Sequence, residues 1–360
     1  MQSVEAQTFL NSPHPNSIEL LVLDDASSDE TPDVVQEFTR RLEQTPQGQH
    51  ISVRYVRSET NIGQFANWNR ALDLCRTELL NVFHDDDVMF PWMLEDLTAA
   101  LDEHPECGIA LSLGNAAVAG SPPPAAEARP SCSVLQGKEY AQELRTGDDT
   151  RLFHVAPPSG LLRVAEVRRI GLRWREDVGP CADSCFWLEA SDGGIPICLL
   201  GAEKPLLARR QHPGSITASS GMRAWTVSFK HLYDLIVELN PDVGKLANLR
   251  RAMMLSGIHA ALEWDTFSTP DAAARTLSNI RDAAECIREL NWASSDEEIA
   301  VYILKPFVKR ALTGQMSFTP CIRLARLLNK DGFRVSPTTW LREAARMFAR
   351  RIYRNRKETT

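Results

Sequence analysis

The sequence has 360 residues, of which 43% are hydrophobic and 24% charged, with a net charge of -7 and a pI of about 5.7. A chain of this length and composition can bury a sizeable core in one large domain or two. The acidic balance argues against sequence-independent binding to nucleic acid, which needs a basic surface to displace counterions from phosphates. No apolar run approaches the roughly 20 residues of a membrane-spanning helix, and residues 1–17 lack the pattern of a secretory signal. We therefore expect a cytoplasmic protein.

The eight cysteines are scattered and include no CxxC pair. This density is far below that of a small disulfide-stabilised scaffold. We expect reduced thiols, most of them buried.

The first two hundred residues alternate short apolar runs with helical stretches, the pattern of a sheet covered by helices. Strands are expected at 18–23, 51–56, 79–83 and 108–113. Helices are expected at 34–42, 65–74 and 91–101, where the apolar spacing is helical. Residues 114–133 contain three consecutive prolines and predict a surface loop or mobile flap. A shorter α/β section is expected from about 135 to 217.

Strand signals largely vanish after residue 221, and the apolar spacing becomes helical. The last 30 residues hold eight Lys and Arg against three Asp and Glu. Within them, residues 340–357 predict a basic amphipathic helix, which can lie on an anionic membrane surface. The alternative is that this helix docks on the acidic body of the same protein.

Acidic side chains follow the first predicted strand. Asp24 and Asp25 stand directly after the apolar run 18–23. Ligands bind at the carboxyl ends of strands in α/β folds, and adjacent carboxylates can hold base N–H groups and ribose hydroxyls. Alternatively, this segment is only a turn in which Ser27, Ser28 or Asp29 caps the next helix.

A denser cluster, His84, Asp85, Asp86 and Asp87, follows the third predicted strand. Adjacent carboxylates repel one another, so a compact chain tolerates them mainly where a cation or several donors compensate. Oxygen ligands at this density suit Mg²⁺ or Mn²⁺. A solvated acidic turn is the alternative, and His84 itself could be a ligand, a substrate contact or a structural histidine.

Three segments carry a further signal through their order. They read LLVLDDASSDET at 20–31, ETNIGQFANWNRAL at 59–72 and NVFHDDDVMFP at 81–91. This order resembles the family 2 glycosyltransferases, whose corresponding motifs are VDDGSTD, NxGxxxARNxG and D-x-D-D followed by a proline. Residues 158–174, 182–188 and 206–217 resemble that family's acceptor-side, base-bearing and closing segments, so the resemblance covers residues 1 to about 217.

The resemblance implies a glycosyltransferase A-type domain at 1–217, α/β and Rossmann-like with a mostly parallel mixed sheet, followed by a helical region at 218–360. It implies an inverting transfer of a sugar from a nucleotide diphosphate-sugar to a hydroxyl acceptor, glycan or lipid-linked, in cell-surface polysaccharide or glycolipid synthesis. Contact with the inner membrane surface would then be peripheral, through 340–357.

The resemblance also assigns roles to particular residues. A Mn²⁺ or Mg²⁺ ion held by Asp86, Asp87 and His84 would offset the charge of the leaving diphosphate. Asp183 would be the catalytic base that accepts the proton of the acceptor hydroxyl. The residues assigned to the nucleotide-sugar are Asp24, Asp25, Asn61, Gly63, Asn67, Asp85, Arg210 and His212.

Each role has an alternative. An Asp before a helical run, such as Asp183, is a preferred N-cap, and Arg210 and His212 are of types usually solvated at a surface. A non-catalytic sugar-nucleotide-binding remnant and a metal-dependent phosphoryl-transfer enzyme are the rival functions.

The sequence also departs from the family pattern. The family begins with an apolar strand of the PxVSVIIPTYN type, whereas residues 1–9 resemble the helix that follows it. We therefore expect a start upstream of Met1 or a degenerate copy of the domain. His84 stands where the family has the first Asp of its metal motif, and Ala182 replaces an acidic residue that often precedes the base.

Overall fold

The computed structural model describes residues 1–11, 16–117, 128–146, 152, 155–210, 220, 222–239, 270–291, 293, 295, 297–301, 304, 322, 325, 326, 328 and 329. The chain divides into two compact units, one of residues 1–212 and 235–242 and the other of residues 213–234 and 243–360. All strands in the described residues lie in the first unit.

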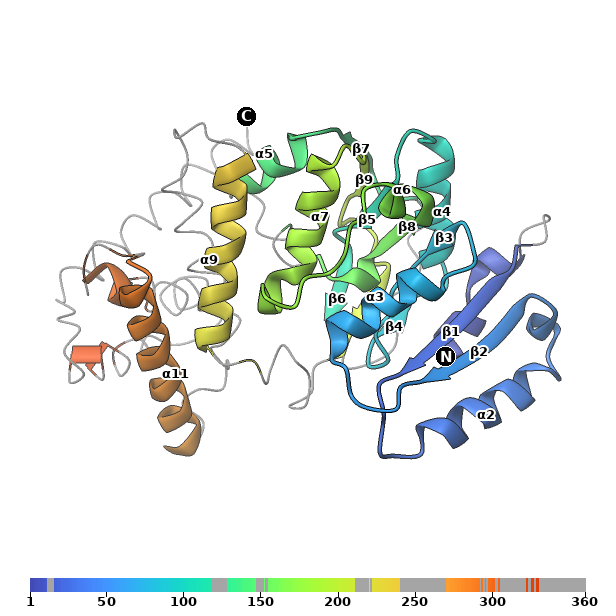
Figure 1. Cartoon of the computed structure of the whole chain (residues 1–360), viewed down its shortest axis with the longest axis horizontal. Helices are drawn as coiled ribbons and strands as arrows, with labels where there is room; N and C mark the ends of the chain where they lie inside the picture. Colours follow the sequence, from blue (N-terminus) through green and yellow to red (C-terminus); the bar gives the residue numbers. More distant parts are fainter. Residues whose placement is uncertain are drawn as a thin grey trace. The chain divides into compact units, whose positions relative to one another are not determined.

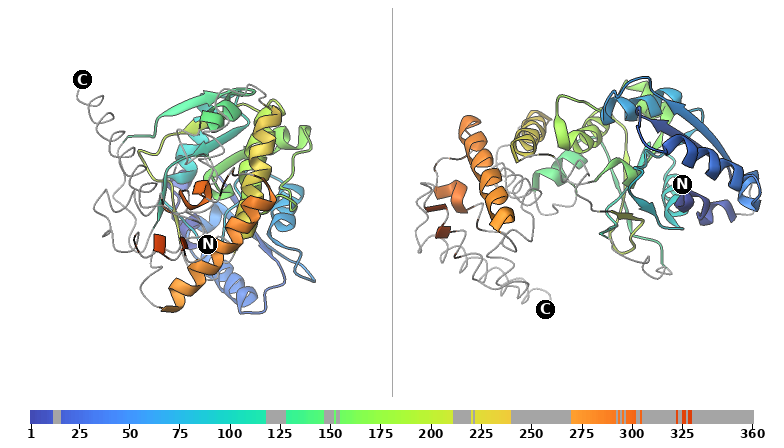
Figure 2. Two further views of the ribbon diagram at one scale, coloured as in Figure 1. Left: turned by 90° about the vertical axis from the view of Figure 1, so that its left-hand side faces the viewer. Right: turned by 90° about the horizontal axis from the view of Figure 1, so that it is seen from below.

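A two-stranded parallel sheet forms the start of the first unit. Strands β1 (Ile18–Asp24) and β2 (Ile51–Arg57) pair in register from Ile18 opposite Ile51 to Asp24 opposite Arg57. Helix α2 (Thr31–Leu42) connects them and lies beside the pair in all views (Figures 1 and 2). Phe38 and Leu42 of α2 pack with Leu10 and Ile51 in one buried cluster. The apolar face of α2 therefore covers this sheet.

The larger sheet has the strand order β3-β8-β5-β9-β7. Its strands are β3 (Leu79–Leu80), β8 (Gly160–Arg163), β5 (Ile109–Ser112), β9 (Ile197–Leu200) and β7 (Cys132–Leu135). Strands β5 and β9 pair in parallel, and the other three pairings in this sheet are antiparallel. A third sheet, of order β4-β10-β6, contains β4 (Val88–Met89), β10 (Leu207–Arg209) and β6 (Asn115–Ala117).

The helices of the first unit flank these sheets (Figure 1). Besides α2, they include α1 (Gln2–Glu5), α3 (Gln64–Leu74), α4 (Met93–Glu103), α5 (Glu139–Thr146), α6 (Val164–Arg169) and α7 (Ala182–Asp192). The α/β class and the mixed sheet with helices around it, predicted from the sequence, are confirmed.

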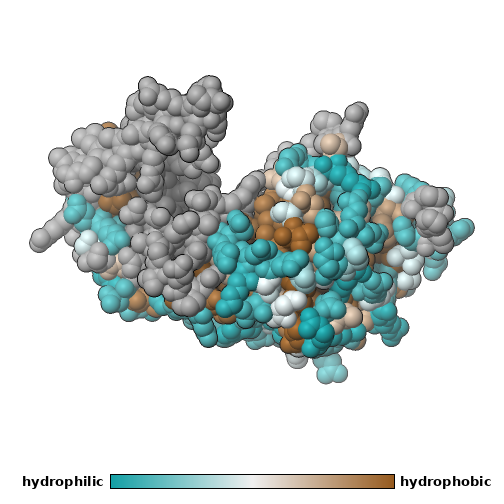
Figure 3. Space-filling model, turned by 90° about the horizontal axis from the view of Figure 1, so that it is seen from above, coloured by the Kyte–Doolittle hydropathy of each residue, from teal (hydrophilic) through white to brown (hydrophobic). Residues whose placement is uncertain are grey.

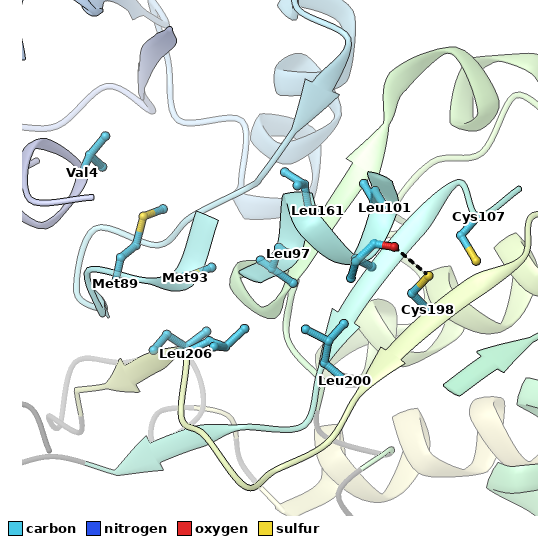
Figure 4. Packing of buried hydrophobic residues seen from close by; sticks show 13 residues of the cluster. Val4, Met89, Met93, Leu97, Leu101, Cys107, Leu161, Cys198, Leu200 and Leu206 are labelled. Atoms are coloured by element: carbon cyan, nitrogen blue, oxygen red, sulfur yellow. Dashed lines mark hydrogen bonds between the residues drawn. The ribbon is translucent and has the colours of Figure 1, made fainter. Parts of the chain in front are cut away.

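The main core joins α4 to the sheet strands. Met93, Leu97 and Leu101 of α4 are fully buried and pack with residues of β5, β8 and β9 (Figure 4). Cys198 of β9 lies 3.6 Å from the backbone oxygen of Ala100, within this cluster. All seven cysteines of the described residues are unpaired and six are buried, Cys132 being exposed. The expectation of free, mostly buried thiols therefore holds for these seven.

The second unit contains most of α9 (Met222–Leu239) and all of α11 (Pro270–Glu289). Arg223 and Glu289, both in this unit, form an ion pair at 2.5 Å. These helices agree with the helical spacing of the sequence, whereas the basic segment 340–357 lies outside the described residues. None of the helices in the described ranges combines the length and apolar content that a membrane span requires.

Two expectations about strands and loops were wrong in part. The strand expected over 79–83 is limited to Leu79–Leu80, because the Asn81 side chain instead donates to the backbone oxygens of Pro158 and Gly160. The loop expected over 114–133 contains β6 and the start of β7 at its two ends. These segments become strands because β10 and β9 pair with them.

The surface of the described residues is of mixed polarity. On the face in Figure 3, hydrophobic areas lie between hydrophilic ones. The large hydrophobic side chains that are exposed in the described ranges are Val34, Ile62 and Ile322.

Candidate active site

Asp24, at the end of β1, is buried with 3% of its surface exposed. Its carboxylate accepts hydrogen bonds from the Ser27 backbone N–H at 2.7 Å and from the Tyr55 hydroxyl, and Arg57 lies 3.8 Å away. Burial by itself would raise the pKa of Asp24, but the hydrogen bonds of Ser27 and Tyr55 and the charge of Arg57 lower it below its ordinary value. One carboxylate oxygen of Asp24 thus holds the turn after β1 and the other contacts β2, and a nucleotide contact by Asp24 stays a prediction.

Asp25 connects this turn to the loop before α3. Its carboxylate accepts hydrogen bonds from the backbone N–H groups of Ile62 at 2.8 Å and Gly63 at 2.9 Å. The Asn61 side-chain oxygen also accepts from the Gly63 N–H, at 3.1 Å. Gly63 has a φ of +85°, which favours glycine at this N-cap of α3. The structure therefore brings Asp25, Asn61 and Gly63 together, although 37 residues separate Asp25 from Ile62.

Asn67 uses both ends of its amide within the protein. Its Nδ2 donates to the backbone oxygen of Leu23 at 3.1 Å, and its Oδ1 accepts from Arg70 at 3.1 Å. These contacts fix α3 against β1.

His84, Asp86 and Asp87 form one group in which each side chain offers a ligand atom within 4.8 Å of the others. Nδ1 of His84 lies 3.6 Å from Oδ2 of Asp87, too far for a hydrogen bond. Nε2 of His84 is buried and has no hydrogen-bond partner among the described residues. Asp85 is exposed and does not belong to the group.

The electrostatics of this group fit a divalent cation. Burial lowers the pKa of His84 to about 4, so the imidazole is neutral near pH 7 and has a free lone pair. Burial, and the charge of Asp86, raise the pKa of Asp87 to about 6. The group thus combines carboxylates, one of them with a raised pKa, and an imidazole nitrogen that has no hydrogen-bond partner among the described residues. Such a donor set can bind Mn²⁺ or Mg²⁺.

Asp183 is the second residue of α7, whose N-cap is Cys181. The interpretation of Asp183 as the N-cap is therefore wrong. Its carboxylate accepts a hydrogen bond from the adjacent Ser184 backbone N–H at 2.7 Å. Burial raises the pKa of Asp183 to about 6, against the opposing effects of the Ser184 hydrogen bond and the charge of Arg209. A carboxyl with this pKa suits proton acceptance near neutral pH.

Arg209 is a site residue that sequence reasoning missed. Its charge acts on His84, Asp87 and Asp183, so one guanidinium lies in the field of both the metal-candidate group and the candidate base. It ends β10, which pairs antiparallel with β4, the strand that follows Asp87. The pair Arg209 and Arg210 is visible in the sequence, but local pattern cannot tell which of the two side chains points to the site.

The predicted Arg210 reaches the site only through its backbone. Its N–H donates to Oδ1 of Asp87 at 3.1 Å, whereas its side chain is exposed. His212 lies outside the described residues.

Comparison with known proteins agrees with the resemblance in the sequence. Residues 1–145 match the family model described as Glycosyl transferase family 2. Uncharacterized proteins of Mycobacterium bovis and Mycobacterium tuberculosis are each 34% identical over 90 residues, which is 25% of this chain and 24% of the relative. The match thus spans about a quarter of the length of these curated relatives.

Two solved structures give weaker similarity. S. aureus TarS 1–349 in complex with UDP-GlcNAc aligns at 16% identity and a TM-score of 0.49, over 84% of this chain and 79% of that chain. Mannosyltransferase PcManGT from Pyrobaculum calidifontis, in complex with GDP-Man and Mn²⁺, aligns at 16% identity and a TM-score of 0.44, over 96% and 80% of the respective chains.

The family match covers part of the α/β region of the chain. It extends over residues 1–145, and it agrees with the resemblance to family 2 glycosyltransferases seen in the sequence.

Proposed function

We propose that this chain transfers a sugar from a nucleoside diphosphate-sugar to a hydroxyl acceptor, with inversion at the anomeric carbon. The new bond joins the acceptor oxygen to that carbon while the bond to the diphosphate oxygen breaks. Asp183 takes the proton of the acceptor hydroxyl, and nucleoside diphosphate leaves. A single inverting displacement requires one base and forms no covalent bond between the sugar and the enzyme.

The observation that carries this proposal is the metal-candidate group His84, Asp86 and Asp87, whose ligand atoms all lie within 4.8 Å of one another. The metal-candidate group His84, Asp86 and Asp87 and the base candidate Asp183 come from segments about 100 residues apart, yet Arg209 acts on members of both. A divalent cation, Mn²⁺ or Mg²⁺, would be held by His84, Asp86 and Asp87, and it would offset the negative charge of the leaving diphosphate. The positive charge of Arg209 would add to this effect.

The nucleoside would lie by the turn that joins β1 to the loop before α3. Asp25, Asn61 and Gly63 are joined by hydrogen bonds at this point. Asp85, which is next to Asp86 in the sequence, has an exposed side chain that can contact the donor. The acceptor we propose is a glycan or a lipid-linked hydroxyl of a cell-surface polysaccharide or glycolipid.

The proposal is tested with a panel of nucleotide sugars that includes UDP-GlcNAc and GDP-Man, by measuring release of nucleoside diphosphate with Mn²⁺ or Mg²⁺. At least one donor should be turned over, and EDTA should abolish turnover. Asp86→Asn and Asp183→Asn should each lower kcat at least about 100-fold, because each removes a charged group that acts in the transition state. The control is Asp33→Asn, an exposed carboxylate on α2, which should retain wild-type kcat.

Other outcomes would identify the rival functions. Binding of a nucleotide sugar without turnover would indicate a non-catalytic binding module. Release of phosphate from simple phosphate esters, independent of any nucleotide, would indicate phosphoryl transfer and overturn the proposal.

A further inference from the structure

Trp68 on α3 is stacked on His84 of the metal-candidate group. The two ring centroids are 5.2 Å apart and the planes differ by 12°. Phe65 also packs edge-on against the Trp68 ring, with the ring centroids 5.2 Å apart and the planes at 84°. His84 is therefore held in one orientation by a ring that is itself packed on its own helix.

Trp174 connects the same helix to α7. Its indole ring lies 5.8 Å from Trp68, edge-on at 74°, and 4.0 Å from Phe186, stacked at 7°. Phe186 follows Asp183 by three residues on α7, so the two lie on one face of the helix. The rings thus form a continuous series from His84 to the turn of α7 that carries Asp183.

The backbone of Trp174 is fixed as firmly as its ring. The Asn69 side chain donates from Nδ2 to the Trp174 oxygen and accepts at Oδ1 from the Trp174 N–H, both at 2.9 Å. These two bonds join residues 105 positions apart in the sequence. Trp174 is 2% exposed and Phe186 is 1% exposed, so neither ring face is available to stack on a substrate.

We propose that Trp68 and Trp174 are positioning residues, which together set the placement of the base Asp183 relative to the metal-candidate group. This inference rests on the proposed function where it treats Asp183 as the base. Rigid rings with few rotatable bonds suit such a task, because they transmit position without the slack of long aliphatic side chains. A displacement of about 1 Å between reacting groups can cost about 100-fold in rate.

The first test separates positioning from substrate binding. Trp174→Leu should lower kcat about tenfold or more and leave the donor KM within about twofold, because the ring touches no substrate. Trp174→Phe keeps a ring to stack on Phe186 and should restore most of kcat. The matched control is Phe38→Leu, another buried aromatic, on α2 and outside this series, which should lower thermal stability with kcat unchanged.

The second test uses metal binding and needs no turnover. Trp68→Leu frees the His84 ring and should weaken Mn²⁺ binding, measured by titration followed with electron paramagnetic resonance. Trp174→Leu should bind Mn²⁺ as the wild type does. The double variant should lose no more kcat than the more affected single variant, because both break one series of contacts.

Several results would overturn the inference. One is a folded Trp174→Leu variant with wild-type kcat, and another is an equal loss of kcat in Trp174→Phe and Trp174→Leu. Strictly additive losses of kcat in the double variant, or an unchanged Mn²⁺ affinity in Trp68→Leu, would also contradict it. If Trp174→Leu does not fold, Asn69→Asp replaces it: this variant loses the bond to the Trp174 oxygen, and an unchanged kcat would contradict the inference. If the wild type transfers no sugar, the proposed function fails, and Mn²⁺ affinity alone decides about Trp68.

Discussion

The Asp25 carboxylate accepts a hydrogen bond from the backbone N–H of Gly63 at 2.9 Å, which ties the end of β1 to the start of α3. A second bond, from the Ile62 N–H at 2.8 Å, makes the connection bidentate. This one side chain therefore organises two of the three motifs that carry the family resemblance.

Removing that side chain should destabilise the domain. We expect Asp25→Ala to lower the free energy of unfolding by about 1–2 kcal/mol, because two charge-assisted hydrogen bonds at a partly exposed site are lost. Urea denaturation measures the change. Asp33→Ala, at an exposed position of α2, is the control and should change stability little; equal losses in both variants would contradict this role of Asp25.

The residue after Asp25 is strained. Ala26 has a φ of +63°, a left-handed conformation that costs a residue with a Cβ atom about 1–2 kcal/mol. Ala26→Gly removes this strain but increases the freedom of the unfolded chain, so we expect a net gain in stability of about 0.5 kcal/mol. Ala66→Gly, within α3, should instead lose about 1 kcal/mol. Thermal melting of both variants tests the contrast, and a loss of stability in Ala26→Gly would refute it.

Asp183 should show a conflict between stability and function. Burial raises the pKa of Asp183 from its ordinary value of 3.8 to about 6, so the folded state favours the protonated form. The contribution of Asp183 to the free energy of unfolding is therefore most favourable below pH 4 and is lost as the pH rises through about 6. At pH 7, Asp183→Asn should be more stable than the wild type by about 3 kcal/mol, and this gain should disappear near pH 4.

The same variant should lose sugar transfer at every pH, since an amide cannot accept the proton. In the wild type, kcat should rise between pH 5 and 7 with a midpoint near 6, as Asp183 becomes ionised. Asp192→Asn, an exposed carboxyl at the other end of α7, is the control for both measurements. A pH-independent kcat over this range would contradict the assignment of the base.

The buried ion pair of Lys204 and Asp96 makes a different prediction. The Lys204 Nζ lies 2.7 Å from Oδ2 of Asp96 and 5.4 Å from the ring centre of Trp92, and both charged side chains are less than a tenth exposed. Lys204→Met should cost about 3–5 kcal/mol, because Asp96 is left charged and buried. The double variant with Asp96→Leu should recover most of that loss in chemical denaturation. A double variant as unstable as Lys204→Met would show that the pair contributes net stability.

Local pattern was a good guide to the longer elements. Strands at 18–23 and 51–56 and the helix at 65–74 agree with β1, β2 and α3 to within one residue. The apolar residues of these elements recur on the side that packs on the core. Because this pattern lies within one short stretch of the chain, the sequence alone shows it. The candidate metal residues His84, Asp86 and Asp87 were visible for a similar reason, since they are neighbours in the chain.

The sequence by itself therefore determined the α/β class, the family resemblance and the acidic clusters, because each depends on residues close together in the chain. Only the tertiary structure decided that the Arg210 side chain is exposed while its backbone N–H donates to Asp87, and that Asp24 is buried in its own turn. It also produced the short strands β4, β6 and β10, whose two or three residues become strands only through their partners. These features come from contacts between segments up to about 120 residues apart, and no local periodicity specifies which distant segment will supply the partner.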